Sequence, residues 1–385
     1  MKVAVVTQYF PTSQQVWAGH SAYQTLRLLA RLCDLHVFYP EATYPRALTP
    51  AAARHAPLDR AWSPPDVAAT YIPYPTHPIV GRPLNGFTMA ARLLPHVRRF
   101  APDLILNYVV YPDGLAAVRI AHALGIPAVL TAIGSDLNRI PGRLVKSLTQ
   151  RTLRQAAVVT TVSRDLAKTA ISLGADPAHT IAILNGCDTA VFHPRDPLEA
   201  RQALAIDPTV EAIIYVGRLD LRKGLLELIE SIAQLHPKRP NLHAYIVGDG
   251  PDKPALLEAI ARPNIASAIT LVPPCPTGKV ALWMAAANLI TLPSYREGCP
   301  NVVIEALASG RAVVASNVGG IPELMDETCG HLIPPMDVPA LTQALDQTLT
   351  QTWDAQAIST KHSRSWSDVA NDLHQVLVDT LSRLG

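Results

Sequence analysis

The chain has 385 residues, and 33 Lys and Arg against 31 Asp and Glu leave a formal net charge of only +2. That balance argues against a nucleic-acid partner, which would require a large excess of positive charge. With 49% hydrophobic and 17% charged residues, the chain is globular rather than disordered, and its length favours two domains.

The first half of the sequence alternates apolar strands with helical patterns. A strand at 3–7, a helix at 22–31 and a strand at 35–39 form a βαβ unit, which implies a parallel sheet. Further strands are predicted at 104–107, 128–131 and 158–162.

A second βαβ series begins with a strand at 212–216, a polar loop at 217–224 and a helix at 225–235. Later strands are predicted at 244–247, 269–272, 289–292 and 312–315, and a final helix at 367–384. The proline-rich stretch 192–197 is the best candidate for a linker between the two series. This order predicts two doubly wound, Rossmann-like α/β domains with a cleft between them, in which ligands bind at the carboxyl ends of the strands.

Cysteine spacing and apolar runs constrain the compartment. The five cysteines (Cys33, Cys187, Cys275, Cys299 and Cys329) are far apart and form no Cys-x-x-Cys pair. This argues against a disulfide framework and against a zinc site, and it favours reduced thiols. We find no signal-peptide pattern and no apolar run of about 18 residues, so we expect a cytoplasmic protein without a spanning helix.

The segment 293–310 follows a strand, opens a helix and carries the strongest chemical signal. Gly298 lets the backbone approach a ligand closely. The amides of Cys299, Asn301 and Val302 then fall at the helix N-terminus, where free N–H groups and the helix dipole favour phosphate.

Two glutamates in this segment, Glu297 and Glu305, are placed to face one polar ligand. A carboxylate suits hydroxyl recognition because it accepts two hydrogen bonds with fixed geometry. The alternative is an acidic N-terminal cap and a solvent-facing glutamate. The apolar neighbours of Glu305 favour a function, because an acid is seldom placed among them without a partner.

The loop from Gly217 to Gly224 carries two cations, Arg218 and Lys223. Arg218 can hold a diphosphate by its planar fork and Lys223 as a point charge. The alternative for this loop, taken alone, is an ordinary solvated turn.

Together these segments resemble the family-4 (GT4) glycosyltransferases, which have the GT-B fold. The matching segments, in the family's order, are Asn185-Gly-Cys-Asp188, the loop 217–224, Gly248-Asp-Gly-Pro251, Glu297 with Glu305, Val318-Gly-Gly-Ile-Pro-Glu323 and Ser365-Trp366. The resemblance covers nearly the whole chain, densely from 185 to 323. It implies an acceptor-side domain at 1–190, a donor-binding domain at 195–365, and a C-terminal helix at 366–385 that crosses back to the first domain.

The resemblance also implies an activity. Family members transfer a sugar with retention from a nucleotide-sugar donor to an acceptor hydroxyl, without a bound metal or other cofactor. The acceptor would be a glycan, a lipid-linked molecule or a small molecule, in polysaccharide or glycolipid biosynthesis. The absence of Asp-x-Asp agrees with a metal-free site.

Carried over by motif, Glu297 would contact donor-sugar hydroxyls, and Arg218 and Lys223 would stabilise the diphosphate leaving group. Cations placed beside the leaving phosphate would speed the reaction, because they stabilise the negative charge that develops there in the transition state. The donor-binding set would be Gly19, Gly217, Gly298, Cys299, Pro300, Asn301, Val302 and Glu305, with Glu305 on the ribose.

The N-terminal half departs from the family pattern. Ala18-Gly19-His20 stands where many members have Gly-Gly, and Ile133 stands where many have a histidine. Asp136 matches a recurring variant and is the predicted acceptor-side group. His20 is a second acceptor-side candidate, although a lone loop histidine is more often structural.

Arg139, Arg143, Lys146, Arg151 and Arg154 form a basic stretch without an acid. Four of them share one helical face, which predicts a solvated face, peripheral attachment to an anionic membrane (here the inner membrane face) or binding of an acceptor phosphate. The first half of the chain has an excess of Lys and Arg and the second an excess of Asp and Glu. That division favours an anionic acceptor or surface on the N-terminal side.

Two other functions stay open at this stage. One is a different GT-B enzyme, such as an epimerase or a phosphorylase. The other is a non-catalytic nucleotide-sugar sensor, for which Ile133 in place of the histidine is the supporting feature.

Overall fold

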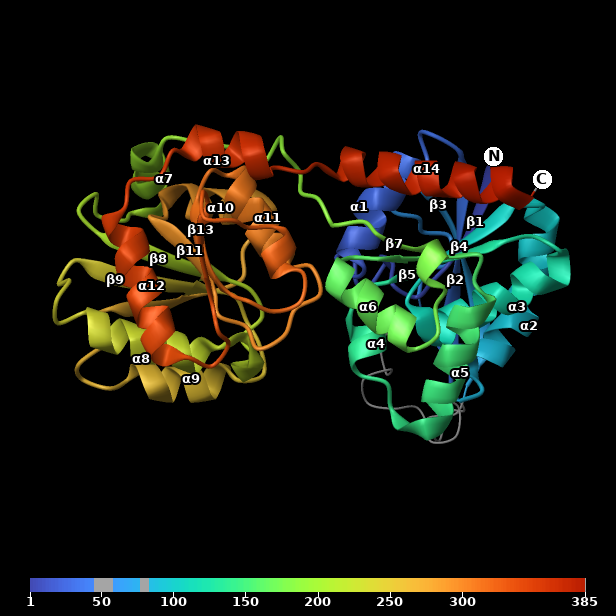
Figure 1. Cartoon of the computed structure of the whole chain (residues 1–385), viewed down its shortest axis with the longest axis horizontal. Coiled ribbons are helices and arrows are strands. Elements are labelled where there is room, and N and C mark those ends of the chain that lie inside the picture. Colours follow the sequence, from blue (N-terminus) through green and yellow to red (C-terminus); the bar gives the residue numbers. More distant parts are fainter. Residues whose placement is uncertain (45–57, 77–82, 385) are drawn as a thin grey trace. The chain divides into compact units, whose positions relative to one another are not determined.

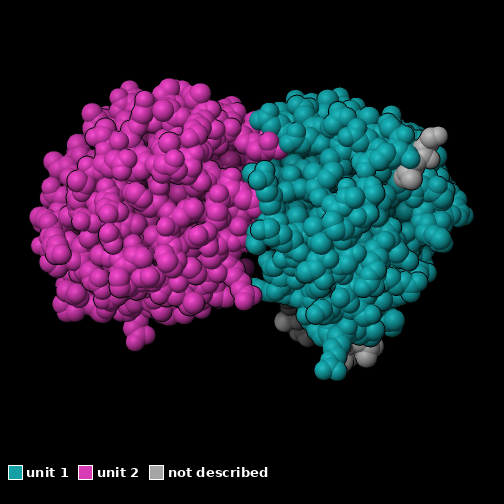
Figure 2. Space-filling model, viewed as in Figure 1, with its two compact units in different colours: residues 1–184, 366–385 teal, residues 185–365 magenta. Residues whose placement is uncertain are grey.

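The computed structural model describes residues 1–44, 58–76 and 83–384. The chain forms two compact units, shown in separate colours in Figure 2. Unit 1 comprises Met1–Leu184 with Trp366–Gly385, and unit 2 comprises Asn185–Ser365. Each contains one parallel β-sheet flanked by helices, which confirms the predicted α/β class with two doubly wound domains.

Unit 1 contains a seven-stranded sheet in the order β3-β2-β1-β4-β5-β6-β7 (Figure 1). Its strands are β1 (Lys2–Val6), β2 (Asp34–Thr43), β3 (Ala68–Pro75), β4 (Leu104–Tyr108), β5 (Ala128–Ala132), β6 (Val158–Thr161) and β7 (Thr180–Ala182). Its helices are α1 (His20–Leu29), α2 (Asn85–Phe100), α3 (Leu115–Leu124), α4 (Ser135–Asn138), α5 (Gly142–Gln155), α6 (Arg164–Ser172) and α14 (Trp366–Leu384).

The core of unit 1 follows from the two-residue period of a strand buried on both faces. Val3 and Val5 of β1 pack with the buried side chains of α1 and α14. Ala4 and Val6 point to the other face and pack with α2 and α3. An uninterrupted apolar run is therefore what a central parallel strand requires.

The last helix, α14, belongs to unit 1 and contacts α1 (Figure 1). Leu373 and Leu377 of α14 are buried in the same cluster as Leu26 of α1. The C-terminal helix therefore returns to the first unit, as predicted. Within the described residues, no helix combines the length and the apolar character needed to cross a membrane.

Unit 2 contains a six-stranded sheet in the order β10-β9-β8-β11-β12-β13. Its strands are β8 (Glu211–Val216), β9 (Leu242–Val247), β10 (Ile269–Val272), β11 (Leu289–Leu292), β12 (Ala312–Ser316) and β13 (Gly330–Ile333). Its helices are α7 (Pro197–Leu204), α8 (Leu225–Leu235), α9 (Lys253–Ile260), α10 (Thr277–Ala286), α11 (Asn301–Ala308), α12 (Val338–Thr350) and α13 (Ala355–His362).

Sequence patterns missed three strands, β3, β7 and β13. β3 contains Pro73 and Pro75, which normally argue against a strand, but it lies at the sheet edge, where a missing N–H is tolerated. In the proposed linker stretch, Phe192 is buried in the unit 2 core, and the two units divide earlier, between Leu184 and Asn185.

Candidate functional site

An ion pair joins two loops at the carboxyl ends of strands β8 and β11 in unit 2. Lys223, at the end of the loop after β8, donates from Nζ to Oε1 of Glu297, which follows β11, at 2.6 Å. The lysine side chain is 29% exposed and the glutamate 10%, so water screens the pair only in part. The structure thus brings two of the predicted catalytic residues into direct contact.

Gly224 allows these two loops to approach each other. Its φ is +70°, and a Cβ there would lie 2.0 Å from the carbonyl oxygen of Pro293. The amide of Tyr295 also donates to the carbonyl of Arg222 at 2.9 Å. The glycine is required both for its left-handed conformation and for the close contact.

Arg218 lies in the same loop and is exposed. Its carbonyl accepts a hydrogen bond from the hydroxyl of Tyr215 at 2.9 Å, which fixes the backbone. A Cβ on Gly217 would lie 2.8 Å from that hydroxyl. In the described part of the chain, no carboxylate lies within ion-pair distance of the Arg218 guanidinium, so it is free to bind an anion.

Glu305 lies on α11, in the second turn after the helix start. Burial raises the pKa of its carboxyl group to about 7. Among the described residues, no side chain or backbone amide forms a hydrogen bond with it. Its side chain is half-buried, and such an acid without a protein partner is unfavourable unless water or a ligand satisfies its oxygens. Glu305 is therefore a strong candidate for contact with a ligand.

The start of α11 is held by neighbouring segments. Asn185 donates from Nδ2 to Oδ1 of Asn301 at 2.9 Å and to the carbonyl of Cys299 at 3.3 Å. The amides of Asn301 and Val302 lack intrahelical acceptors because they open the helix. Asn185 is a positioning residue that sequence reasoning did not select, although its motif had been noted.

The loop after β12 supports the other side of this segment. Gly320 donates its amide to the carbonyl of Gly298 at 2.8 Å. A Cβ on Gly319 would lie 2.0 Å from the carbonyl oxygen of Glu297. Burial raises the pKa of the Cys299 thiol to about 12, so this side chain stays protonated and is no nucleophile.

Arg218, Lys223, Glu297, Glu305 and the amides at the start of α11 together form what we call the unit 2 site. It combines two cations, one paired and one unpaired acid, and a helix N-terminus. A diphosphate fits the cations and amides, and hydroxyl groups fit the two acids.

Unit 1 has a cavity of about 480 Å³, here called the unit 1 pocket, lined by residues that include Gln8, Tyr111, Asp136, Arg139 and Thr149. Gln8 follows β1 and Asp136 follows β5, so the pocket lies at the carboxyl ends of the strands. Among its lining side chains, the tyrosine rings and Arg139 are the groups that could contact a ligand.

Asp136 reaches this pocket, but its oxygens are already occupied. They accept hydrogen bonds from the amides of Val110 at 2.9 Å, Ile133 at 3.1 Å and Gly134 at 2.9 Å. Burial raises the pKa of its carboxyl group, and these hydrogen bonds oppose the rise. The carboxylate therefore organises the loop, and little of it is left for a ligand.

Asp113 is a second buried acid of unit 1, and sequence reasoning missed it. Its carboxylate accepts a hydrogen bond from the amide of Gln8 and one from the hydroxyl of Thr7. Burial, opposed by these bonds, raises its pKa to about 7. No sequence signal marked it, because its burial depends on strands β1 and β4 lying side by side.

The first βα loop of unit 1 ends at Gly19 and His20. Gly19 has φ of +59°, and a Cβ there would lie 2.3 Å from the carbonyl group of Tyr9. The His20 ring packs edge-on against Trp366, with the ring centroids 6.4 Å apart. Partial burial, and then the charge of Arg27, lower the pKa of His20, which favours its neutral form.

Helix α5 carries the basic stretch. Arg143, Lys146, Arg151 and Arg154 are all exposed, whereas Val145, Thr149 and Thr152 on the opposite side are buried. The residues Arg119, His122 and Arg151 also line a second cavity of about 560 Å³ in unit 1. The predicted basic face is therefore available to an anionic surface.

Residues 211–351 match the family model described as Glycosyl transferases group 1, and residues 18–191 match the model described as Glycosyltransferase Family 4. The putative teichuronic acid biosynthesis glycosyltransferase TuaC of Bacillus subtilis is 32% identical over 287 residues, which are 73% of this chain and 67% of that protein.

The alpha-maltose-1-phosphate synthase of Mycolicibacterium smegmatis is 29% identical over 355 residues, 86% of this chain and 84% of that protein. Among solved structures, Anabaena Alr3699/HepE in complex with UDP is similar in fold, with a TM-score of 0.76 at 19% identity. That alignment covers 98% of this chain and 100% of the Anabaena chain.

Proposed function

The chain belongs to the family-4 glycosyltransferases, and on this premise we propose that it transfers a sugar with retention from a nucleotide-sugar donor to an acceptor hydroxyl. The observation that carries the proposal is the pair of Lys223 and Glu297 beside the unpaired Arg218. The names of relatives that act in glycan synthesis favour a role in polysaccharide or glycolipid formation.

In this proposal the two cations hold the diphosphate. As the bond from the sugar to the phosphate breaks, negative charge develops on the phosphate oxygens, and Arg218 and Lys223 stabilise it. The free amides at the start of α11 add hydrogen-bond donors for the phosphate, and these amides are already held in place by the helix. These groups take the role that a metal ion plays in other transferases, so we expect turnover without a catalytic metal.

The two acids bind hydroxyl groups of the donor. Glu297, held by Lys223, is oriented to accept from hydroxyl groups of the sugar. Glu305 has no protein partner in the described residues, and the two ribose hydroxyls would satisfy both of its oxygens. A hydroxyl-rich ligand would therefore supply the hydrogen bonds that this carboxylate lacks within the protein.

We propose retention by front-face attack, with the leaving phosphate accepting the proton of the acceptor hydroxyl. Front-face attack requires no protein nucleophile, which agrees with a protonated Cys299 thiol and a Glu297 carboxylate held by Lys223. The unit 1 pocket would hold the acceptor, with tyrosine rings against sugar faces and Arg139 beside an anionic group.

UDP-sugars are the first donors to test, because the structurally similar Anabaena protein was solved with UDP and with UDP-glucose. The full-length protein would be incubated with UDP-, GDP- and ADP-sugars and with acceptors, in the presence of EDTA. We expect release of one nucleoside diphosphate and, by NMR, a product with the anomeric configuration of the donor.

Each other result of that experiment has a clear meaning. An inverted product, or turnover that requires added Mg²⁺, would contradict the proposed chemistry. Tight nucleotide binding with no turnover against any acceptor would identify a sugar-nucleotide sensor instead. Phosphate-driven breakdown of a glycan would identify a phosphorylase.

We also propose that the basic face of α5 attaches the protein to an anionic membrane surface at the inner membrane face. Four exposed cations without an acid on the same helix support this. Flotation with vesicles that contain phosphatidylglycerol, compared with vesicles of phosphatidylcholine alone, tests it. Equal binding to both vesicle types would contradict the attachment.

A further inference from the structure

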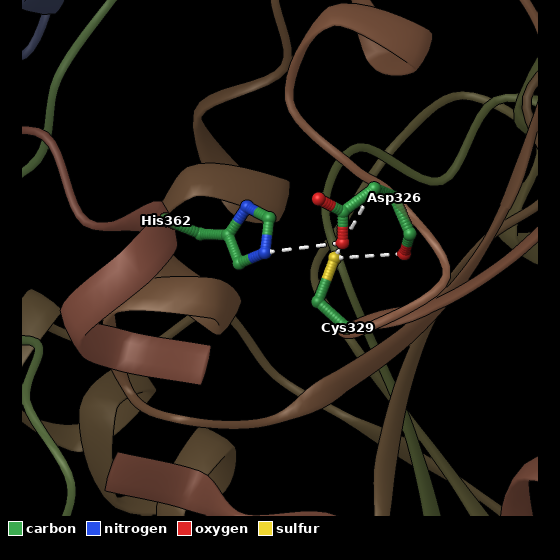
Figure 3. Close-up of side chains that lie close together, drawn as sticks. All are labelled: Asp326, Cys329 and His362. Carbon is green, nitrogen blue, oxygen red and sulfur yellow. Dashed lines mark hydrogen bonds and ion pairs between the residues drawn. The ribbon is translucent and has the colours of Figure 1, made fainter. Parts of the chain in front are cut away.

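Three side chains with metal-binding atoms meet in unit 2, outside the unit 2 site (Figure 3). A carboxylate oxygen of Asp326, Sγ of Cys329 and a ring nitrogen of His362 lie within 4.8 Å of one another. Asp326 and Cys329 come from the loop before β13, and His362 is the last residue of α13. The cysteine is fully buried, and the histidine side chain is only 9% exposed.

The two oxygens of the Asp326 carboxylate already have different neighbours. Oδ2 forms an ion pair with Nζ of Lys361 at 2.7 Å, whereas Oδ1 faces Nε2 of His362 at 3.5 Å. Oδ1 also accepts hydrogen bonds from the amide and the hydroxyl of Thr328 at 2.9 and 2.5 Å, and that hydroxyl lies 3.3 Å from Nε2, so a bound cation would displace the hydroxyl. Two ligands bonded to a tetrahedral zinc ion at their usual lengths lie about 3.3–3.6 Å apart. The spacing of the oxygen and the nitrogen therefore suits one shared cation.

Cys329 provides the third ligand atom. Its Sγ lies 3.3 Å from the carbonyl oxygen of Asp326 and 3.4 Å from its amide nitrogen, so the sulfur is held beside the aspartate (Figure 3). On binding a cation, the thiol would lose its proton to solvent and coordinate as the thiolate.

The ligand set selects the metal. Thiolate and imidazole are poor ligands for Mg²⁺ and Ca²⁺, which prefer oxygen, whereas Zn²⁺ accepts sulfur, nitrogen and oxygen together. We propose that Asp326 Oδ1, Cys329 Sγ and His362 Nε2 form a zinc site, with water in the fourth position. Cysteine spacing argued against zinc, because the site uses a single cysteine and its histidine comes from α13, which only the fold brings beside the loop.

The position in the sheet points to a structural role. Val313, near the start of β12, donates its amide to the carbonyl of Cys329, so the cluster lies at the amino ends of the parallel strands. The loops of the unit 2 site follow the carboxyl ends of β8 and β11. Zinc would join the loop before β13 to the end of α13, and it would not contact the transferred sugar.

The test uses full-length protein stripped with EDTA and then titrated with zinc. We expect about one zinc per chain by native mass spectrometry and a rise in melting temperature of about 5 °C or more. With Co²⁺ as probe, the wild-type protein should show the near-ultraviolet absorption of a thiolate–cobalt bond. This readout needs no variant, so it holds even if substitutions impair folding.

Variants separate a metal site from a set of ordinary contacts. His362→Gln should weaken zinc binding by more than about 10-fold, while Cys275→Ser, which changes a partly buried cysteine elsewhere in unit 2, should not. Lys361→Ala should retain or strengthen zinc binding, because it removes a nearby positive charge. Absence of zinc uptake and of the cobalt band, or unchanged uptake in His362→Gln, would overturn the proposal.

Discussion

The unit 2 site and the unit 1 pocket use their acids in opposite ways. In unit 1, the carboxylates of Asp113 and Asp136 accept hydrogen bonds from backbone amides and so hold loops in place. In unit 2, Glu297 is bonded to a flexible lysine side chain, and Glu305 has no partner in the described residues. An acid used by the backbone is part of the scaffold, whereas one left without a donor is available to a ligand.

The same contrast holds for the cations. Arg218 and Lys223 lie on one short loop after β8, and Nζ of Lys223 reaches Oε1 of Glu297 at 2.6 Å. The unit 1 pocket has Arg139 and several tyrosines, which favour a ligand bound through ring faces and one anionic group. The comparison predicts that donor recognition depends on charge in unit 2 and that acceptor recognition in unit 1 does so much less.

The largest effect is expected for Lys223→Ala. The substitution removes a cation from the developing phosphate charge and leaves Glu297 unpaired, so kcat should fall by about 10²–10³-fold. The matched control is Arg222→Ala, because that neighbouring side chain is paired with Asp220 instead. Equal loss in both variants, measured by nucleoside diphosphate release, would mean that the loop matters and the Lys223 charge does not.

Asp113 and Glu305 both have a pKa raised to about 7, but only Glu305 is expected to contact the donor. Glu305→Gln should weaken donor binding by about 10-fold or more, since an amide replaces two acceptor oxygens. Asp113→Asn should leave donor binding unchanged. Isothermal titration calorimetry with the donor measures the affinity of each variant. Loss of binding in Asp113→Asn would contradict the division into acids that hold the scaffold and acids that bind the ligand.

The unfolding free energies of these two variants should also differ from that of the wild type in a way that depends on pH. The pKa of each acid is about 7 in the folded protein, above its ordinary value of 3.8 or 4.5, so the wild type loses stability as pH rises between those values. Each amide variant should therefore gain about 1–3 kcal/mol of unfolding free energy at pH 8 and little at pH 4.5. Urea unfolding at both pH values is the measurement.

Arg139→Ala tests the unit 1 pocket. Losing its one arginine should raise the acceptor KM by about 10-fold for an anionic acceptor and leave the donor KM unchanged. The control is Arg143→Ala, an exposed cation that does not line the pocket. A rise in donor KM instead would mean that Arg139 contacts the donor, and it would contradict the assignment of the unit 1 pocket to the acceptor.

The smallest effect is expected on the basic face of α5. Lys146→Gln should weaken binding to phosphatidylglycerol vesicles by about fivefold at low salt and less at high salt. Lys168→Gln changes an exposed lysine on α6 and should have no comparable effect. If both substitutions act equally, the attachment reflects overall charge and not this face.

The unit 2 site was largely predictable because its residues lie in short motifs. Lys223 and Glu297 were selected on separate loops, and two parallel strands with adjacent carboxyl ends bring such loops together. The helix over 225–235 was also predicted within its observed bounds, since an apolar stripe follows a glycine that begins the helix.

The unit 1 pocket could not be predicted in the same way. Asp113 owes its burial to the packing of β1 beside β4, which no local pattern encodes. Asp136 was selected as a polar group for the acceptor, but whether its oxygens are free depends on amides that the fold places around it. β3 was missed because edge position, which permits its prolines, is a property of the whole sheet.

The most direct test of this account is donor binding measured by calorimetry on the full-length protein and on variants of both units. We expect Lys223→Ala and Glu305→Gln each to lose at least about 10-fold in affinity for the donor, while Arg139→Ala and Asp113→Asn keep the wild-type value. Unchanged affinity in both unit 2 variants, or an equal loss in the unit 1 variants, would contradict the claim that the unit 2 site holds the nucleotide sugar.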